Sequence, residues 1–430
     1  MKEEKMLRKL YEAHISKAVK VNFPHFVKVA EGARVRTVDG REFIDLTGGI
    51  GVQNLGHGHG GVLDAMADQM RRYLHLCFTV QMYEAPILLA EKLAAIMPRG
   101  LTKSAFFNSG AEALENAAKF SRNFTGRTAV ISFENSFHGR TFFTMALTGK
   151  VRPYKGVFGP SFPDVYQVPY PYPYRSPDGP DGSVRRSLEA IERLFHAQVS
   201  PDDVAAIVVE PVQGEGGFIV PPEGFLQGLR ELCDTHGIVL VDDEVQSGLG
   251  RTGRWNAIDH FGVTPDLVTS GKAIGGGLPL SAVTGTPEII DHPPVGSIGG
   301  TFGGNPLSCT AGLAAIEGIE RILPGVRDLE KRLRARLEGW VEAFDAVGEA
   351  RGLGAMMAIE LVTNPRRKDP APKLAKAVQD ECYQRGLLIL TAGYYDNVIR
   401  FHPPLNMDLE ELDTALDTTE KALQTVTMKG

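Results

Sequence analysis

Between about residue 62 and residue 285, stretches with helical periodicity alternate with short apolar runs, and this alternation restricts the fold more than any other feature of the chain. Apolar residues recur with the period of a helix over residues 62–73, 86–97, 110–122, 184–195 and 224–236. The strands expected between them are Ala105–Phe107, Ala129–Phe133, Val165–Val168, Ala205–Val209, Ile238–Val241 and Leu267–Thr269. Repeated strand–helix units predict an α/β fold with a largely parallel sheet covered by helices on both faces.

One strand of this sheet should run against the others. Only about ten residues separate Lys272 from the apolar run Ser281–Gly285, whereas a parallel crossover needs roughly a dozen or more. We therefore expect Ser281–Gly285 to be an antiparallel strand in an otherwise parallel sheet.

The N-terminal part of the chain has a different pattern. Residues 1–20 are expected to form a short amphipathic surface helix, and Val35–Leu46 a hairpin. The glycine-rich segment 47–59 contains His57 and His59, but no acidic or cysteine partner stands near them in the sequence. We therefore interpret this segment as a loop shaped by its backbone and not as a metal site.

The C-terminal part is expected to form a second, smaller α/β domain. After Asn305-Pro306 a helix should run to about Ile322, break at Pro324-Gly325 and resume through Phe344. The elements expected beyond it are a strand at Ala355–Val362, a helix at 371–385, strands at Leu387–Leu390 and Val398–Phe401, and a last helix opened by a capping box of Asp408 and Glu411. The chain is thus divided into an N-terminal segment (1–60) that packs with the small domain or across a subunit interface, a large domain (61–325) and a C-terminal small domain (326–430).

Composition argues against several classes of protein. A hydrophobic content of 43% and a charged content of 23% are those of an ordinary globular protein. A net charge of -6 argues against nucleic-acid and anionic-membrane partners. The four cysteines are far apart, which favours reduced thiols over a disulfide framework or a zinc site. The N-terminus lacks the apolar region of a secretory signal and no apolar run is long enough to span a membrane, so we expect a cytoplasmic protein.

Lys272 lies between Gly271 and the triple glycine 275–277, directly after a short apolar run. Glycines on both sides let a bulky group approach the backbone closely. This setting suits a Schiff-base lysine, whose amine must lose its proton and reach a carbonyl carbon. On this stretch alone, an ordinary loop lysine is an equal alternative.

Two acidic residues follow strands in the same way as Lys272. Glu210, Asp243 and Lys272 end successive apolar strands and are each separated by about 30 residues, the length of one βαβ unit. Because the carboxyl ends of neighbouring parallel strands meet at the ligand crevice, we expect these side chains to converge on one pocket. Asp243 could hold the protonated ring nitrogen of an electron-sink pyridine cofactor. A helix cap or a loop acid is the alternative, and Asp242 fits that alternative better.

An anion site is expected where the strand Ala105–Phe107 runs into Ser109-Gly110-Ala111. A helix should open there, with Ser109 and Glu112 as a capping box. Free backbone N–H groups and the helix dipole favour a phosphate at such an end. A plain helix N-terminus is the alternative.

Aromatic and charged residues elsewhere indicate a flat heterocycle and an acidic substrate. Phe137 and His138 follow a strand and could stack on a ring, while Arg140 and Arg400 could each bind a carboxylate through two hydrogen bonds. Together with Glu215, which lies in a glycine-rich loop, the two arginines favour a dicarboxylate substrate. Surface salt bridges are the common alternative for each of these charges.

Two further segments have other interpretations. The proline-rich segment 160–183 is expected to be an ordered surface loop, with docking of a partner as the alternative. Gly248–Gly253 matches the pattern G-x-G-x-x-G, but no clear helix opens there and no ribose-binding acid ends a following strand. Nicotinamide binding is therefore not expected.

Taken together, these motifs resemble those of the class III pyridoxal-phosphate aminotransferases of fold type I, the group of the ornithine and 4-aminobutyrate aminotransferases. The matching motifs are Gly48–Ile50, Asn108–Ala111, Phe137–Thr141, Glu210–Gly217, Asp243–Gly248, Ser270–Lys272, Gly300–Pro306 and Val398–Arg400. Because they occur in order along almost the whole chain, the resemblance is specific. It implies a large domain with a mostly parallel sheet, one strand of it antiparallel, and a smaller α/β domain.

The resemblance also implies which residues bind pyridoxal 5′-phosphate. Lys272 would carry the cofactor as a Schiff base, Asp243 would pair with the pyridinium nitrogen, and Gln246 would hydrogen-bond the ring hydroxyl. The remaining residues of the implied cofactor site are Ser109, Gly110 and Ala111 at the phosphate, Phe137 stacked on the ring, His138, Glu210 and, from the neighbouring subunit, Thr301. Because such sites are built between two subunits, a homodimer or a dimer of dimers is implied.

Within the class, the 4-aminobutyrate group is the most similar, because Ile50, Arg140, Glu215 and Arg400 match its substrate set. The implied reaction is a ping-pong transfer of the amino group of 4-aminobutyrate, or of a similar ω-amino acid, to 2-oxoglutarate, giving succinate semialdehyde and glutamate. Arg140 would bind the 4-aminobutyrate carboxylate while Glu215 pairs with Arg400. When glutamate or 2-oxoglutarate binds, Glu215 would release Arg400 to the α-carboxylate.

Alternatives on the same scaffold stay open. Acetylornithine or ornithine aminotransferase activity also suits the two arginines and the glutamate, although Ile50 and the loop 393–397 favour the 4-aminobutyrate group. An amino-acid racemase or epimerase would re-protonate the α-carbon and need no keto acid. Thr79 replaces the glutamine that the 4-aminobutyrate group has near Cys77-Phe78, so the fine substrate contacts stay open. A nucleotide-binding or purely structural protein is disfavoured by the combination of Lys272 and Asp243.

Overall fold

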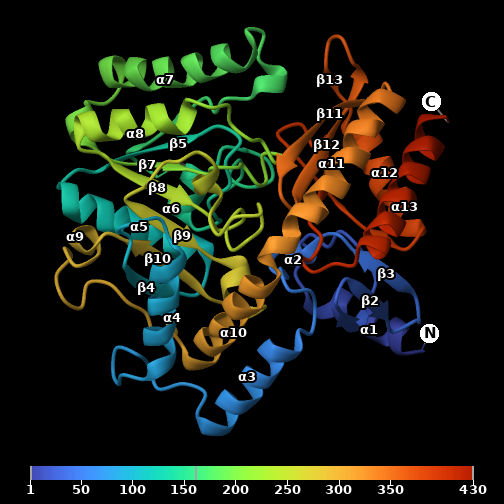
Figure 1. Cartoon of the computed structure of the whole chain (residues 1–430), viewed down its shortest axis with the longest axis horizontal. Helices are drawn as coiled ribbons and strands as arrows, with labels where there is room; N and C mark the ends of the chain where they lie inside the picture. The colour runs from blue at the N-terminus through green and yellow to red at the C-terminus, as the bar shows by residue number, and fades with distance from the viewer. Residues whose placement is uncertain (1, 160–161, 429–430) are drawn as a thin grey trace.

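The computed structural model describes residues 2–159 and 162–428, and within them the strands form sheets of seven, five and four strands (Figure 1). The seven-stranded sheet has the order β4-β10-β9-β8-β7-β5-β6. Its strands are β4 (Lys103–Phe107), β5 (Ala129–Phe133), β6 (Val165–Val168), β7 (Val204–Val209), β8 (Val239–Asp243), β9 (Leu267–Ser270) and β10 (Ser281–Gly285). The pairs among β5 to β9 are parallel, whereas β10 runs antiparallel to both β9 and β4. The predicted α/β class and the single reversed strand are therefore confirmed.

Helices cover both faces of this sheet because successive side chains of a strand point to opposite faces. Strand β7 is buried along its whole length. Its Ile207 and Val209 pack with apolar residues of α7 (Gly179–Ala197) and α8 (Phe225–His236). Its Ala206 and Val208 pack on the other face, with α5 (Gly110–Thr125). The other helices that precede the C-terminal part are α1 (Lys2–His14), α2 (Gly48–Gly51), α3 (Gly60–Arg72), α4 (Glu84–Ile96), α6 (Phe142–Leu147), α9 (Pro287–Ile290) and α10 (Pro306–Ile322).

The C-terminal part builds the five-stranded sheet, in which β11, β12, β16 and β15 are neighbours and β13 pairs with β12. Its strands are β11 (Val347–Leu353), β12 (Met356–Asn364), β13 (Asp369–Pro370), β15 (Leu390–Ala392) and β16 (Val398–Phe401). The helices around it are α11 (Val326–Ala343), α12 (Pro372–Gln384) and α13 (Leu409–Thr427), and one continuous apolar core joins them to the sheet. As predicted, α10 and α11 are separated by a break at Pro324-Gly325.

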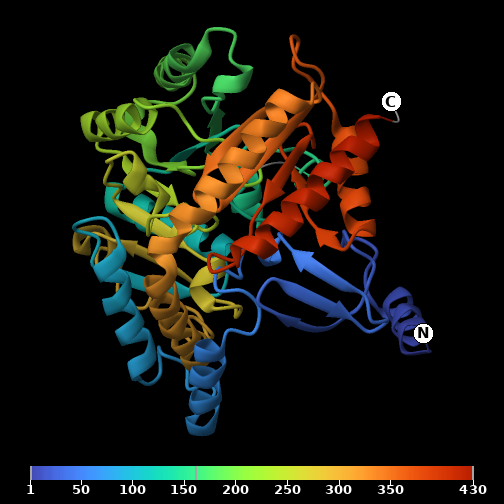
Figure 2. The ribbon, with the colours of Figure 1, turned by 45° about the vertical axis from the view of Figure 1, so that its right-hand side comes forward.

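The N-terminal hairpin pairs with a strand from the far end of the sequence. Strands β1 (Val27–Glu31), β2 (Arg34–Thr37) and β3 (Glu42–Asp45) form an antiparallel ribbon, and β3 pairs in parallel with β14 (Leu387–Leu388). In both ribbon views these N-terminal strands (blue) lie beside the C-terminal elements (red) (Figure 2). Of the helices in the described ranges, none is both long and apolar enough to cross a membrane.

Three local expectations were wrong. Asp242, assigned to a loop or cap, is fully buried inside β8, where it pairs in register with Val209 and Val268. Asp408 caps α13 alone, because the Glu411 carboxylate instead lies 2.7 Å from Arg34 Nε. His57 does have an acidic neighbour, since its Nε2 lies 2.9 Å from Asp45 Oδ2. All three contacts depend on residues that sequence spacing did not bring together.

The proline-rich segment is less exposed than the sequence indicated. Residues 160–161 lie outside the described residues. Beyond them the chain forms β6 and a short helical turn, Pro173–Arg175, before α7 begins at Gly179. Tyr170 is buried, and its hydroxyl donates a hydrogen bond of 3.0 Å to the backbone oxygen of Glu210. The segment is therefore anchored against the sheet and is not a simple surface loop.

Candidate active site

Three neighbouring strand ends converge on one cavity. Strands β7, β8 and β9 lie side by side, and Glu210, Asp243 and Lys272 stand at or just beyond their carboxyl ends. The cavity has a volume of about 180 Å³. It is lined by Gly110, Ala111, Phe137, His138, Gly139, Glu210, Asp243, Val245, Gln246 and Lys272. The structure thus brings together most of the cofactor-site residues expected from the sequence.

Lys272 is held in a backbone conformation that side chains rarely adopt. It opens the helical turn Lys272–Gly275 with φ of 48°. A non-glycine residue in this region costs about 1–3 kcal/mol and is typical of functional sites. Burial lowers the pKa of the Lys272 amine to about 8, although the nearby carboxylate of Glu215 opposes this shift. With such a pKa roughly one amine in ten is neutral at pH 7, far more than for an exposed lysine, so Lys272 can act as a nucleophile or a base.

Asp243 is buried and oriented by three hydrogen bonds. Its Oδ2 lies 2.7 Å from Nδ1 of His138. Its Oδ1 accepts from the Val245 backbone N–H and from the Thr269 hydroxyl, both at 3.1 Å. Burial lowers the pKa of His138, but the Asp243 carboxylate outweighs this effect and raises the pKa overall. The result is a fixed carboxylate that faces the cavity, and Thr269, which the sequence did not single out, helps to fix it.

The start of α5 forms the expected anion-binding end. Ser109 is the N-cap and its hydroxyl accepts the Glu112 N–H at 3.2 Å. The predicted capping box is only half present, because the Glu112 carboxylate accepts the backbone and side-chain N–H groups of Asn108 at 2.9 and 2.8 Å. A Cβ atom on Gly110 would lie 2.8 Å from Val245 Cγ1, so only glycine fits there. The backbone N–H groups at this helix end therefore stay accessible to a phosphate.

Glu210 shapes the two loops beside the cavity. Its carboxylate accepts the Phe137 N–H and the Gly214 N–H, both at 3.0 Å. Burial raises the pKa of Glu210 to about 7, with His138 opposing and Asp243 adding to the shift. These contacts make Glu210 a residue that positions Phe137 and the glycine-rich loop.

Glu215 and Arg400 form an ion pair between two distant parts of the chain. Arg400 comes from β16, and its Nη1 bonds to Glu215 Oε1. The Arg400 side chain is 5% and the Glu215 side chain 20% exposed, so the pair is largely shielded from water. Neither residue lines the cavity, but Glu215 lies close enough to Lys272 to act on the pKa of its amine. Burial raises the pKa of Glu215, yet Arg400 and Lys272 more than reverse this and lower it. Glu215 is therefore ionised and compensates the charge of Arg400.

Tyr154 was missed by the sequence analysis, although it lies among the charged groups. Its ring centroid is 4.6 Å from the guanidinium of Arg140 and 4.9 Å from the ring of Phe137. Burial raises its pKa to about 12, and the charges of Glu215, Arg140 and Arg400 also act on it. No pattern in the sequence marks this tyrosine, because it stands in a segment without regular periodicity. Its ring packs against the guanidinium of Arg140, which is exposed.

Some expected residues lie at the edge of the cavity or away from it. Ile50 is 43% exposed and has φ of 63°. Gly51, next to it, packs so closely that a Cβ atom there would lie 3.0 Å from Cε1 of His402, just beyond Arg400. Thr301 is exposed and does not line the cavity; Gly299 and Gly300 beside it line a second cavity together with Thr79.

The polar and aromatic groups around the cavity fit pyridoxal 5′-phosphate. Within the described ranges, Oε1 of Gln246 is buried without a hydrogen-bond partner and lines the cavity. The Lys272 amine can meet the carbonyl of this cofactor, and the fixed Asp243 carboxylate can meet its ring nitrogen. The start of α5, kept open by Gly110, suits its phosphate, and the Phe137 ring suits the face of its ring.

Comparisons with known proteins agree with this chemistry. The aminotransferase class-III family matches residues 15–423. A probable 4-aminobutyrate aminotransferase of Bacillus subtilis (strain 168) is 44% identical over 95% of this chain and 95% of its own. The 5-aminovalerate aminotransferase DavT of Pseudomonas aeruginosa is 40% identical over 96% of this chain and 97% of its own. The structure of the taurine:2-oxoglutarate aminotransferase of Bifidobacterium kashiwanohense, in complex with PLP and glutamate, is similar with a TM-score of 0.92 and 29% identity, covering 98% of both chains.

Proposed function

This chain belongs to the class-III aminotransferases, and from that premise we propose that it transfers the amino group of 4-aminobutyrate to 2-oxoglutarate, giving succinate semialdehyde and glutamate. Its cofactor is pyridoxal 5′-phosphate. The observation that carries the substrate assignment is the Glu215–Arg400 ion pair near the exposed Arg140. Among the described residues Arg140 forms no ion pair, whereas Arg400 is paired with Glu215, an arrangement that suits a substrate with one carboxylate. Release of Arg400 by Glu215 suits a substrate with two.

We propose the following roles in binding the cofactor. The first-turn N–H groups of α5, with Ser109, hold the phosphate, Phe137 covers the ring, and Gln246 reaches the ring hydroxyl. Asp243, oriented by His138 and Thr269, keeps the ring nitrogen protonated. When bound, the cofactor supplies an electron sink that stabilises negative charge on the substrate carbon bearing the amine.

Lys272 is the proposed acid–base residue. Its pKa of about 8 lets it lose and regain a proton near neutral pH. In the first half-reaction its amine takes a proton from the amine-bearing carbon of the donor, and in the second it returns a proton to the corresponding carbon of the acceptor. The two halves share one site, so the kinetics are ping-pong.

The two substrates differ in how they use the arginines. We propose that Arg140 binds the carboxylate of 4-aminobutyrate while Glu215 stays on Arg400. When 2-oxoglutarate or glutamate binds, Glu215 leaves Arg400, which takes the α-carboxylate. Tyr154 limits the space for the substrate chain on the side of Arg140, and Ile50 limits it at the outer edge of the site.

A spectroscopic half-reaction tests the proposed function. The purified holoenzyme is expected to be yellow and to lose that absorbance when 4-aminobutyrate is added without an acceptor, and 2-oxoglutarate should restore it. Lys272→Ala is the control that should show no such cycle. A holoenzyme whose spectrum 4-aminobutyrate leaves unchanged would refute the assignment of the donor.

A second donor, 5-aminovalerate, is favoured by the similarity to DavT. It carries the same charges as 4-aminobutyrate and one more methylene, a difference that a pocket discriminates by only about 1–3 kcal/mol. The same titration with 5-aminovalerate gives the ratio of kcat/KM values, and a ratio that favours the longer donor would reassign the enzyme.

We further propose a homodimer, or a dimer of dimers, whose subunits share their sites. Thr301 does not line its own cavity, and the apolar side chain of Phe302 next to it is 60% exposed. Subunit mass in solution by light scattering tests this, and a monomer with full activity would contradict it. We also propose a cytoplasmic location, which the unpaired state of the four cysteines supports. The division into segments 1–60, 61–325 and 326–430 is likewise proposed, with the first joined to the third through β3 and β14.

A further inference from the structure

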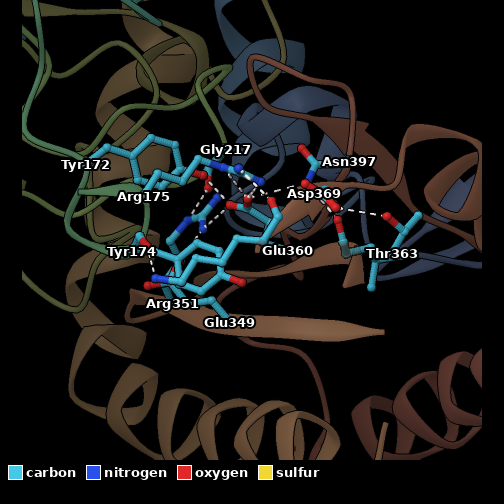
Figure 3. Close-up of polar contacts among 12 residues, drawn as sticks. Tyr172, Tyr174, Arg175, Gly217, Glu349, Arg351, Glu360, Thr363, Asp369 and Asn397 are labelled. Carbon is cyan, nitrogen blue, oxygen red and sulfur yellow. Dashed lines mark hydrogen bonds and ion pairs between the residues drawn. The ribbon is translucent and has the colours of Figure 1, made fainter. Parts of the chain in front are cut away.

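A second ionic network, separate from the Glu215–Arg400 pair, is formed by Tyr172, Arg175, Arg351 and Glu360 (Figure 3). Glu360 has no exposed side-chain surface. Its Oε2 lies 2.6 Å from Arg351 Nη1 and also bonds to the Tyr172 hydroxyl. Its Oε1 accepts from Arg175 Nε at 2.7 Å. We call these four side chains the Arg351–Glu360 network.

The network is charged and costly to bury. Burial raises the pKa of Glu360, but Arg351 and the other donors outweigh this and lower it, so the carboxylate is ionised. A buried ion pair is often no more stabilising than apolar residues of the same size. Neither the cofactor nor a substrate is bound by these residues in the proposed mechanism. The network therefore needs another explanation, and its contacts supply one.

The first contact leads to Glu215. Arg351 Nε donates a hydrogen bond of 2.8 Å to the backbone oxygen of Gly217, two residues beyond Glu215. Gly217 has φ of 112°, and a Cβ atom there would lie 3.0 Å from Arg351 Nη2. The loop is closed at its base by the Gly217 N–H, which donates to Gly214 at 3.1 Å. Arg351 thus fixes one side of the short loop that carries Glu215.

The second contact leads to Arg400. Asn397, which directly precedes β16, donates to Glu360 at 3.4 Å and to the Leu361 backbone oxygen at 2.7 Å. In the register of the two strands, Glu360 pairs with Val398 and Ala358 pairs with Arg400. One carboxylate therefore lies beside the strand that presents Arg400 and also holds the arginine that fixes the Glu215 loop.

The third contact comes from the proline-rich segment. Tyr172 and Arg175 reach Glu360 from this segment, so the network joins the connection between β6 and α7 to strands β11 and β12 of the five-stranded sheet. The Arg351 guanidinium also lies 5.1 Å from the centre of the Tyr172 ring. This gives the segment 170–175 a role that its proline-rich sequence did not reveal.

We propose that the Arg351–Glu360 network is a positioning device for substrate specificity: it holds Glu215 against Arg400 and so sets the balance between monocarboxylate and dicarboxylate substrates. This inference rests on the proposed function. When a substrate with one carboxylate binds, Arg400 must stay compensated by Glu215, because an unpaired buried charge is costly. When a substrate with two carboxylates binds, Glu215 must leave in any case. Loosening the loop should therefore impair the first half-reaction and spare the second.

Two variants test the network with a matched control. Arg351→Lys keeps the positive charge near Glu360 but lacks the fork that reaches Gly217 and Glu360 together. Tyr172→Phe keeps the ring beneath Arg351 and removes only the hydroxyl that bonds to Glu360. Tyr174→Phe is the control, because in the described part of the chain its buried hydroxyl has no hydrogen-bond partner.

Each half-reaction is measured separately by stopped-flow absorbance of the holoenzyme. For Arg351→Lys we expect kcat/KM with 4-aminobutyrate to fall about tenfold, the effect of one lost hydrogen bond to a charged group. For Tyr172→Phe we expect a loss of roughly three- to tenfold. In both variants the KM for 2-oxoglutarate should stay within about twofold of the wild type or fall, and Tyr174→Phe should change neither half-reaction.

Equal losses in both half-reactions, or equal effects of Tyr172→Phe and Tyr174→Phe, would overturn the proposal and leave the network a merely structural feature. If Arg351→Lys does not fold, Tyr172→Phe and its control decide the question by themselves. A wild-type enzyme that does not react with 4-aminobutyrate would refute the proposed function, and this inference with it. That failure is seen before any variant is made and is thus distinct from failure of the network alone.

Discussion

His138 and Asp243 face each other inside the protein, with Nδ1 of the histidine 2.7 Å from Oδ2 of the aspartate and neither side chain more than slightly exposed. Asp243 raises the pKa of His138 against the effect of burial, and their short contact fixes how the two side chains face each other. Because Val245 and Thr269 hold the other oxygen of Asp243, the carboxylate cannot turn away from the cavity. The pair therefore presents a fixed negative charge to a protonated ring nitrogen.

Replacing Asp243 by asparagine should lower kcat by about 10²–10³-fold, because the charge that keeps the ring nitrogen protonated is lost while the shape is kept. His138→Asn should cost less, roughly tenfold, since it removes one hydrogen bond to a charged group and leaves the carboxylate. The kcat of each variant is measured by steady-state kinetics with saturating cofactor. Asp243→Asn with wild-type turnover would contradict the role of this carboxylate.

Replacing Lys272 by alanine should lower kcat by at least about 10⁴-fold, because both the covalent attachment of the cofactor and the acid–base group are lost. The remaining contacts should still hold the cofactor, now without a covalent bond. Reduction with borohydride followed by mass spectrometry should then leave the variant unlabelled, whereas the wild type is labelled at Lys272. Lys331→Ala, an exposed position on α11, is the control and should behave as the wild type. Full activity of Lys272→Ala would end the proposal.

The pH dependence of cofactor attachment follows from the pKa of Lys272. Burial lowers this pKa from 10.5 to about 8, and only the neutral amine attacks a carbonyl. In the cofactor-free protein, the rate of attachment should therefore rise as the pH increases and reach half of its maximum near pH 8. Absorbance after rapid mixing with pyridoxal 5′-phosphate at a series of pH values gives the midpoint. A midpoint near that of a free lysine would show that the amine is not desolvated.

Much of the site could be predicted because it depends on strand order. Glu210, Asp243 and Lys272 each follow an apolar strand, and neighbouring parallel strands place their ends side by side. The reversal of β10 follows in the same way from the short connection after Lys272. These features need only the length and the period of local segments.

The unpredicted features depend on contacts between residues far apart in sequence. Strand β11 contains two glycines, Gly348 and Gly352, and two charged residues, Glu349 and Arg351, so it has no strand-like pattern, yet it carries Arg351 to Gly217. Tyr154 stands in a segment without periodicity and meets Arg140 only in the folded chain. Asp242 was expected in a loop or a helix cap, but it lies fully buried in β8, where burial and the neighbouring Glu244 and Asp243 carboxylates raise its pKa well above the usual range.

Replacing Glu215 or Arg400, the two partners of one ion pair, should impair opposite half-reactions. Arg400→Ala removes the group that binds the α-carboxylate, so kcat/KM for the 2-oxoglutarate half-reaction should fall by about 10²-fold, whereas the 4-aminobutyrate half-reaction should fall only a few-fold. Glu215→Gln leaves Arg400 uncompensated and should impair mainly the 4-aminobutyrate half-reaction. Single-turnover absorbance changes with each substrate separate the two effects. If each variant lowered both half-reactions equally, the pair would stabilise the site without selecting between substrates. Opposite selectivity in the two variants requires that one side chain alternates between two partners, because a static salt bridge would weaken both half-reactions whichever partner was removed.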